Sequence, residues 1–168
     1  TDLLVGGTPV FVGEVPGTLP EIPDDLAVYA SRNLKLMIAA ADEIRNDIED
    51  AISRYGRDRI AVVMGTSTSG IAEGESAIEH ALAEGQLPPD FDMRKQELGS
   101  TGEALARYLG LAGPALTVST ACSSGAHALA MGRRFIQSGL VDAVVAGGAD
   151  SLCRLTVNGF HALSAHTA

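Results

Sequence analysis

The sequence predicts an α/β layered fold in which helices flank a largely buried sheet. Short, mostly apolar runs at residues 60–64, 115–118 and 141–146 are typical of strands buried on both faces. Other stretches carry apolar residues at three- and four-residue steps, which is typical of helices with one buried face. Because strands alternate with helices along the chain, a layered α/β domain is favoured.

The first 23 residues predict edge strands or extended loops. Two apolar runs, Leu3–Val5 and Val10–Val12, are separated by Gly and Pro residues, and three further prolines follow at positions 16, 20 and 23. Proline lacks a backbone donor and is confined to the edges of sheets, so neither run is expected in the sheet interior.

A helix is predicted from about Asp24 to Gly56. Asp24 or Asp25 can cap its first turn, and a glycine commonly ends a helix. The apolar stripe comprises Leu34, Met37, Ile38, Ala41, Ile44, Ile48, Ala51 and Ile52. We interpret the acidic residues that fall mostly off this stripe as a solvated face without chemistry, namely Asp42, Glu43, Asp47, Glu49 and Asp50.

The predicted strand at 60–64 leads into the loop Gly65–Gly70 and a helix from about Ile71 to Glu84. This loop has the glycine spacing of a phosphate-binding loop, but Ile71 and Ala72 stand where a Lys and a Ser or Thr are required. Without that lysine the phosphate charge is unmatched, so we interpret the loop as a tight turn at a strand end. Its hydroxyl groups remain candidates to line a pocket.

The remaining elements continue the alternation. We expect a helix near 102–109, a strand at 115–118, a helix from just after Cys122 to about Ser138, and a strand at 141–146 that leads into two glycines. A chain of 168 residues is long enough for one domain with its own core.

Composition excludes several classes of function. The net charge of −9 at pH 7 leaves no basic surface for nucleic acid. No apolar run approaches the roughly 20 residues that span a bilayer, and the first residues lack a signal-peptide pattern, so we expect a soluble, cytoplasmic protein. Cys122 and Cys153 fit no disulfide framework, and we expect neither a metal site nor a cofactor.

Cys122 is the sharpest candidate for chemistry. A predicted strand delivers it to the first turn of a helix, where unpaired N–H groups and the helix dipole favour a thiolate. The small residues 123–126 leave room for a thioester carbonyl, and N–H groups at such a turn can hold an oxyanion. From spacing alone, a buried packing cysteine fits equally well.

For the other cysteine and the histidines we find no pattern that indicates chemistry. Cys153 follows the glycine pair without an evident helix N-terminus, and we interpret it as a packing residue. His127 stands five residues after Cys122. At about 100° per helical residue the two side chains lie on different faces, so His127 is a poor direct base. We expect His80 at the surface, and no metal-ligand spacing involves His161 or His166.

Five segments together carry a family resemblance: Ser31–Asn33, Gly65–Ile71, Thr120–His127, Val144–Asp150 and Gly159–Ser164. With them the chain resembles the β-ketoacyl-acyl carrier protein synthases, the thiolase-like condensing enzymes of fatty-acid and polyketide synthesis. The resemblance covers most of residues 29–166. The cysteine motif followed by the Gly-Gly-Ala strand end is its most specific part.

The resemblance implies that residues 1–168 are the N-terminal part of a thiolase-like layered fold, a mixed sheet flanked by helices. It implies that the family's first strand and helix lie upstream of Thr1. The C-terminal half, which carries two catalytic histidines and a further backbone donor, is likewise expected outside this chain. None of the four histidines of this sequence matches those positions.

The resemblance also implies a reaction. An acyl group moves from a carrier-protein thioester to Cys122, and a decarboxylating malonyl-carrier thioester then attacks it to give a 3-oxoacyl thioester. Cys122 is the only catalytic residue carried over, with its N–H as half of an oxyanion hole. Family members form homodimers, which places Leu116–Ser119 near a partner subunit.

Two alternatives remain open. The first is a non-catalytic relative that shapes the chain-length pocket of a partner, although such partners commonly replace the nucleophile that is present here as Cys122. The second is a cysteine hydrolase on another fold, although neither the papain-type nor the caspase-type signature surrounds Cys122. The 168-residue chain by itself is expected to be inactive as a condensing enzyme, because catalytic groups that act as a unit are not additive.

Overall fold

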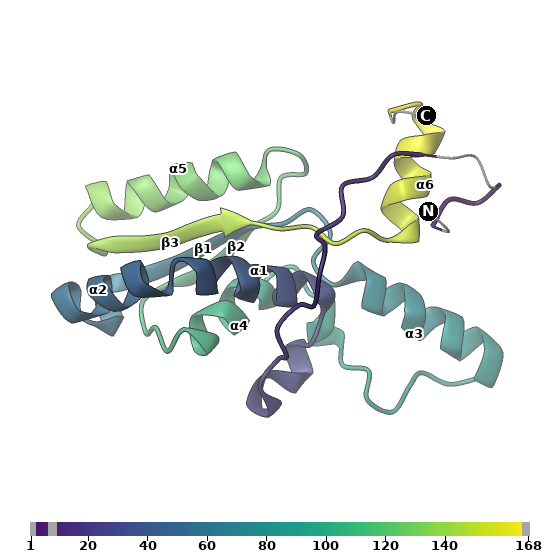
Figure 1. The fold of residues 1–168 in the computed structure, drawn as a ribbon, viewed down its shortest axis with the longest axis horizontal. Coiled ribbons are helices and arrows are strands. Elements are labelled where there is room, and N and C mark those ends of the chain that lie inside the picture. Colours follow the sequence, from purple (N-terminus) through teal and green to yellow (C-terminus); the bar gives the residue numbers. More distant parts are fainter. Residues whose placement is uncertain (1–2, 7–9, 166–168) are drawn as a thin grey trace.

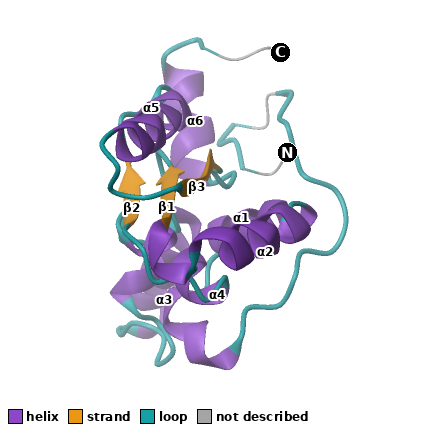
Figure 2. Cartoon of the chain, turned by 90° about the vertical axis from the view of Figure 1, so that its left-hand side faces the viewer, coloured by secondary structure: helices purple, strands orange, loops and turns teal. Residues whose placement is uncertain are grey.

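The computed structural model of the chain describes residues 3–6 and 10–165, and these form three layers (Figures 1 and 2). A parallel sheet is the middle layer. One face of the sheet is covered by α5 (Ser124–Gln137), and the other by α1 (Arg32–Glu43), α2 (Arg45–Tyr55) and α4 (Ser100–Tyr108). Beyond the carboxyl ends of the strands lie α3 (Ile71–Glu84) and α6 (Arg154–Ala162).

The sheet has the strand order β2-β1-β3, with β1 (Ile60–Gly65) between β2 (Ala115–Val118) and β3 (Ala143–Gly148). Val62 of β1 lies opposite Ala115 and Val145. The predicted α/β layers are therefore confirmed. The expectation of a mixed sheet is wrong for the described residues, because both strand pairs are parallel. A helix in each connection returns the chain to the starting edge, which makes the paired strands parallel.

Most predicted elements occur within about two residues of their expected positions, and two differences have a clear structural cause. The single helix expected over 24–56 is divided into a 3-10 helix (Asp24–Tyr29), α1 and α2. Ser31 is the N-cap residue of α1, because its hydroxyl accepts a hydrogen bond from the Leu34 N–H at 3.2 Å. Ile44 separates α1 from α2, since it leaves the helical conformation at φ −107°, ψ 20°. Two further 3-10 helices span Arg57–Arg59 and Met93–Lys95.

The start of β3 is the second difference, two residues later than expected. Asp142 instead belongs to the turn before the strand, where its N–H donates to the Arg59 carbonyl and its carboxylate pairs with the Arg59 Nε at 2.7 Å. The 10–23 segment contains no strand, so of the two alternatives for the described N-terminal residues, the extended loop is the one found.

The core lies between β1 and the helices on the α1 side. All residues of β1 are buried. Its alternate residues Ile60, Val62 and Met64 belong to one hydrophobic cluster with Leu34, Ile38 and Leu105. The opposite face is covered less completely, because Leu129 and Ile136 of α5 remain 60% and 46% exposed. Among the helices of the described residues, none is long and apolar enough to span a membrane.

Gly65 brings the end of β1 against the start of α5. A Cβ at this position would lie 2.6 Å from the Ser124 carbonyl carbon and 2.7 Å from the Gly125 nitrogen. Both are backbone atoms at a helix start, so they cannot rotate away. The absence of a side chain at Gly65 therefore fixes how closely α5 approaches the sheet.

The variant Gly65→Ala is expected to lower the free energy of unfolding by about 1–3 kcal/mol, because the added methyl group must displace backbone. Gly159→Ala is the matched control, since a Cβ at Gly159 in α6 meets no atom within 4 Å. Urea denaturation of both variants in the full-length protein tests this. Equal stabilities of the two variants would contradict it.

Glu73 of α3 connects to the first turn of α1. Its Oε1 accepts from the Arg32 N–H at 2.7 Å, whereas its Oε2 is buried without a partner among the described residues. Burial raises the pKa of Glu73, and the hydrogen bond from Arg32 opposes that rise. The folded protein therefore binds the proton of Glu73 more tightly than the unfolded chain does.

The pH dependence of stability follows from the sign of this shift. A folded pKa above the unfolded value means that the folded state binds the proton more tightly, so the contribution of Glu73 falls as pH rises through that interval. Glu73→Gln keeps an oxygen for the Arg32 N–H and removes the charge. We expect it to raise the unfolding free energy at pH 7 by up to about 1 kcal/mol, with a gain that vanishes toward about pH 4. A loss of stability at pH 7 in chemical denaturation would refute this.

Candidate active site

The loops that follow the three strands meet at one edge of the sheet. This gathering is a consequence of the parallel arrangement, because the carboxyl ends of all strands point the same way. The loop after β1 supplies residues 66–70, the segment after β2 supplies Cys122, and the segment after β3 supplies Asp150 and Ser151. Candidate groups far apart in sequence thus share one region.

Cys122 sits at the exposed tip of a turn between β2 and α5. The preceding residue, Ala121, has φ +52°, a left-handed conformation that costs a non-glycine residue about 1–2 kcal/mol. This conformation turns the chain sharply between the strand and the helix. Cys122 therefore lies two residues before the first residue of α5, beside its N-terminal N–H groups.

Ser124 holds the turn in this conformation. Its buried Oγ accepts from the Thr120 N–H at 2.9 Å and donates to the Ala121 carbonyl at 2.6 Å. The two bonds span the strained residue and the thiol. Ser124 thus offsets the strain at Ala121 and fixes the direction in which the Cys122 side chain leaves the backbone.

His127 contacts Thr120 and has no hydrogen bond to the thiol. Its Nδ1 lies 2.8 Å from the Thr120 Oγ1, and its side chain is on the exposed side of α5. Within the described part of the chain, no histidine forms a hydrogen bond with Cys122. His127 therefore bonds to the turn that precedes its helix.

Asp150 connects the end of β3 to the loop after β1. Its Oδ1 accepts from the Thr66 hydroxyl at 2.7 Å, from the Ser67 N–H at 2.7 Å, and from the Thr68 N–H and hydroxyl at 3.0 Å each. Thr66 is itself buried and accepts from the Asn33 amide at 3.1 Å. The carboxylate of Asp150 thus occupies the loop N–H groups that a phosphate would need, which supports the interpretation of Gly65–Gly70 as a structural turn.

An open cavity of about 550 Å³ lies between these loops and α6. Cys122 lines it together with Ser67, Thr68 and Asp150, so the hydroxyl-bearing loop does contribute to a pocket. The rest of the lining is largely apolar, with Val10, Phe11 and Val12 of the N-terminal segment, Leu152, and Val157 and Phe160 of α6. The exposed thiol therefore opens on a space with one polar and one apolar side.

Cys153 is buried, as a packing cysteine should be, but its setting differs from the expectation. It is the N-cap residue of α6, a helix that the sequence pattern did not predict. Its Sγ lies 3.1 Å from the Thr156 Oγ1. A helix start follows Cys153 because the chain must turn away from the sheet after β3.

Neither of the other two described histidines lines the cavity. His80 is exposed on α3, His161 is half-buried on α6, and His166 lies outside the described residues. Among the described residues, no three His, Cys, Asp or Glu side chains are grouped so that they could hold a metal ion.

Sequence reasoning missed the roles of Asp150 and Ser124. Both lie within the segments that carry the family resemblance, but nothing in their local pattern shows which backbone groups they bind. The position of Asp150, two residues after a strand that ends in two glycines, was the available signal, because the carboxyl ends of parallel strands carry functional loops. The apolar side of the cavity was missed because α6 itself was not predicted.

The variant Ser124→Ala is expected to lower the unfolding free energy by about 1–3 kcal/mol, because it leaves the Thr120 N–H unpaired. Ser123→Ala is the control, since the Ser123 hydroxyl is exposed and bonds mainly to the Thr120 carbonyl at 2.7 Å. Thermal unfolding of both full-length variants makes the comparison. A larger loss for the Ser123 variant would show that Ser124 does not hold the turn.

Comparison with known proteins connects this geometry to a family. Residues 11–168 match the family described as the N-terminal domain of beta-ketoacyl synthase. The 3-oxoacyl-[acyl-carrier-protein] synthase 2 of Rhizobium meliloti is 32% identical over 84% of this chain and 33% of its own length. The ketoacyl synthase alpha subunit of the tetracenomycin polyketide synthase of Streptomyces glaucescens is 32% identical over 87% of the chain and 36% of its own length.

Solved structures show the same fold. A chain in the complex of a ketosynthase with its chain length factor from Xenorhabdus doucetiae superposes with a TM-score of 0.91 at 44% identity. That match covers 98% of this chain and 42% of the other. The present chain spans about a third of the length of the curated relatives. On the match over residues 11–168, the chain belongs to the β-ketoacyl synthase family of condensing enzymes.

Proposed function

We propose that the protein carrying this chain is a 3-oxoacyl-[acyl-carrier-protein] synthase with Cys122 as its acyl acceptor. The observation that carries the proposal is the placement of an exposed thiol on a strained turn at the start of α5, opening on a partly apolar cavity. Membership of the family supports the reaction type. The cavity supports a substrate with an acyl chain, which the apolar lining would remove from water.

In the first step the Cys122 thiolate attacks the carbonyl carbon of an acyl thioester. The new bond joins Sγ to that carbon, and the bond to the carrier sulfur breaks, so the carrier leaves as a thiol after taking up a proton. The Cys122 N–H, just before α5, is proposed as one donor to the oxyanion.

In the second step a malonyl thioester loses carbon dioxide, and its carbanion attacks the acyl group on Cys122. A carbon–carbon bond forms as the bond to Sγ breaks, which returns the thiolate and gives a 3-oxoacyl thioester two carbons longer. This step needs hydrogen-bond donors for the enolate. No described histidine is bonded to Cys122, so we propose that groups elsewhere in the full-length protein supply them.

The second candidate is a non-catalytic subunit that shapes a partner's pocket. Two similar solved structures support this candidate, because the Xenorhabdus doucetiae complex and the ishigamide complex each contain a ketosynthase and a chain length factor. Cys122 favours the catalytic role, because a subunit that only shapes a pocket has no use for an exposed thiol at a strained turn.

A partner subunit is also part of the proposal. We propose that β2, at the edge of the described sheet, faces a second subunit in a homodimer. Leu116 of β2 is 41% exposed, and an edge strand with an exposed apolar side chain is well suited to being covered. Acyl carrier protein is proposed as the donor of both thioesters, on the strength of the family membership.

Incubation of the full-length protein with an acyl-carrier thioester is expected to add one acyl mass at Cys122. The label should be absent from Cys122→Ala and retained in Cys153→Ala, because Cys153 is buried. Intact-protein and peptide mass spectrometry measure both. Acylation at Cys153, or nowhere, would rule out Cys122 as the acceptor, and absence of any label would favour the non-catalytic subunit.

A further inference from the structure

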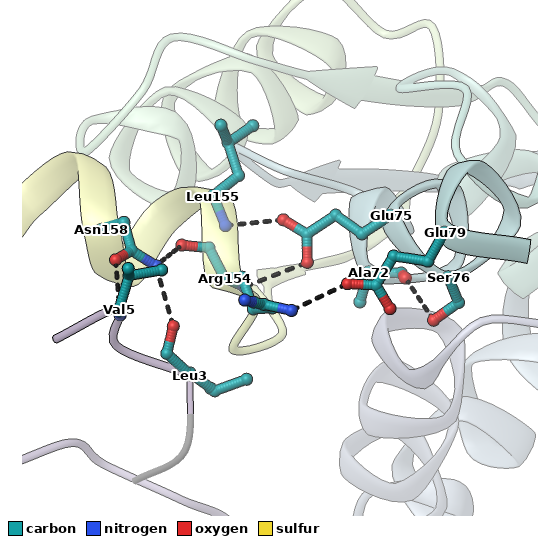
Figure 3. Close-up of polar contacts among 9 residues, drawn as sticks. All are labelled: Leu3, Val5, Ala72, Glu75, Ser76, Glu79, Arg154, Leu155 and Asn158. Atoms are coloured by element: carbon teal, nitrogen blue, oxygen red, sulfur yellow. Dashed lines mark hydrogen bonds and ion pairs between the residues drawn. The ribbon is translucent and has the colours of Figure 1, made fainter. Parts of the chain in front are cut away.

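We propose that Glu75 of α3 is a positioning residue that sets acyl-chain selectivity by holding α6 against the Cys122 cavity. The inference rests on the function proposed above. Glu75 does not line the cavity, and its effect would pass through the helix that it binds. Figure 3 shows the carboxylate of Glu75 directed at the start of α6, beside the pair formed by Glu79 and Arg154.

Glu75 caps α6 from outside the helix. Its Oε2 accepts from the Arg154 N–H at 3.0 Å and its Oε1 accepts from the Leu155 N–H at 2.6 Å (Figure 3). The cap residue Cys153 provides no side-chain hydrogen bond to these groups. The first two N–H groups of α6 therefore obtain their acceptors from α3, 79 and 80 positions away in sequence.

The charge of Glu75 is also matched to this helix. The first turn of α6 carries no acidic residue and begins with the cation of Arg154. A cation at the positive end of a helix dipole is unfavourable, and an anion there is favourable. The carboxylate of Glu75 supplies the negative charge that the sequence of α6 lacks.

The helix held in this way is a wall of the cavity. Thr156, Val157 and Phe160 of α6 line the same space as Cys122. Val157 is 9% exposed and packs α6 against the domain, whereas Phe160 is 47% exposed and projects into open space. A shift of α6 along its axis would move both relative to the thiol, and the length of chain that fits would change.

A contact of α6 with the N-terminal segment joins the same wall. Asn158 donates to the Leu3 carbonyl at 2.8 Å and accepts from the Val5 N–H at 2.9 Å (Figure 3). Val10–Val12, further along that segment, also line the cavity. Two sets of hydrogen bonds, one at Glu75 and one at Asn158, thus fix α6 between α3 and the N-terminal segment.

Glu79 offers a matched control on the same helix. It pairs with the Arg154 guanidinium at 2.8 Å, but the two side chains are 61% and 52% exposed. An exposed ion pair of this kind contributes little, whereas Glu75 binds backbone N–H groups. Glu75→Gln and Glu79→Gln each remove one negative charge from α3 and keep the side-chain shape, but only the first disturbs the cap.

The test measures rates of Cys122 acylation by a short and a long saturated acyl-carrier thioester in the full-length protein. For Glu75→Gln we expect the ratio of the two rates to change by roughly fivefold, the factor that corresponds to the free energy typically lost with a helix cap. For Glu79→Gln the ratio should stay within about twofold. Hydrogen exchange at Arg154 and Leu155 should quicken only in the Glu75 variant.

The outcomes separate this inference from the proposed function. If the wild type is not acylated at Cys122, the function itself fails and the inference with it. If the wild type is acylated without a chain-length preference, or if Glu75→Gln keeps the wild-type ratio while exchange in α6 quickens, Glu75 has only a structural role and the inference is overturned. Should Glu75→Gln not fold, Glu75→Asp, which keeps the charge but shortens the reach, is judged by the same ratio.

Discussion

One carboxylate oxygen organises the working edge of this domain. The Oδ1 of Asp150 accepts from two hydroxyl groups and two backbone N–H groups of the loop after β1, and so joins the ends of β1 and β3. The buried Thr66 extends this network to Asn33 at the start of α1. The network pairs backbone donors of the loop that the strand ladder leaves unpaired. It also positions Ser67 and Thr68, which line the cavity together with Cys122.

In the Cys122 turn, the backbone strain at Ala121 is offset by hydrogen bonds of the neighbouring Ser124. Ala121 adopts a conformation that favours glycine, yet a glycine there would leave the thiol loosely held. The structure instead combines a residue with a side chain, the buried hydroxyl of Ser124 and the close approach allowed by Gly65. Strain of this kind persists only where the surroundings determine it, and it is common at reactive sites.

The sequence was most informative about local structure. The sequence pattern predicted α3, β2 and the start of β1 closely, because these elements have clear ends, with Gly70 and Gly85 on either side of α3. It failed at α6, which has only nine residues and no capping side chain of its own, since its first N–H groups are capped by Glu75 from a distant helix. The division of the first long helix at Ile44 was missed because its apolar pattern continues across the break. The sequence allowed the prediction that hydroxyl groups of the loop Gly65–Gly70 line a pocket. The hydrogen-bond partners of Asp150 and Ser124 could not be predicted, because tertiary contacts determine them.

The two carboxylates of Glu73 and Glu75 stand two positions apart on α3 and reach the first turns of different helices, α1 and α6. Because α3 supplies acceptors for N–H groups in the first turns of both helices, it fixes the position of one relative to the other. Displacement of α3 along its axis therefore acts at once on the core side of the domain and on the cavity wall. The exposed face of α3, with Ile78 and Leu82 at 60% and 83% exposure, is mechanically linked to the thiol's surroundings without touching them. In a redesign of the pocket, substitutions on α3 would change the position of the α6 wall without altering any residue that lines the cavity.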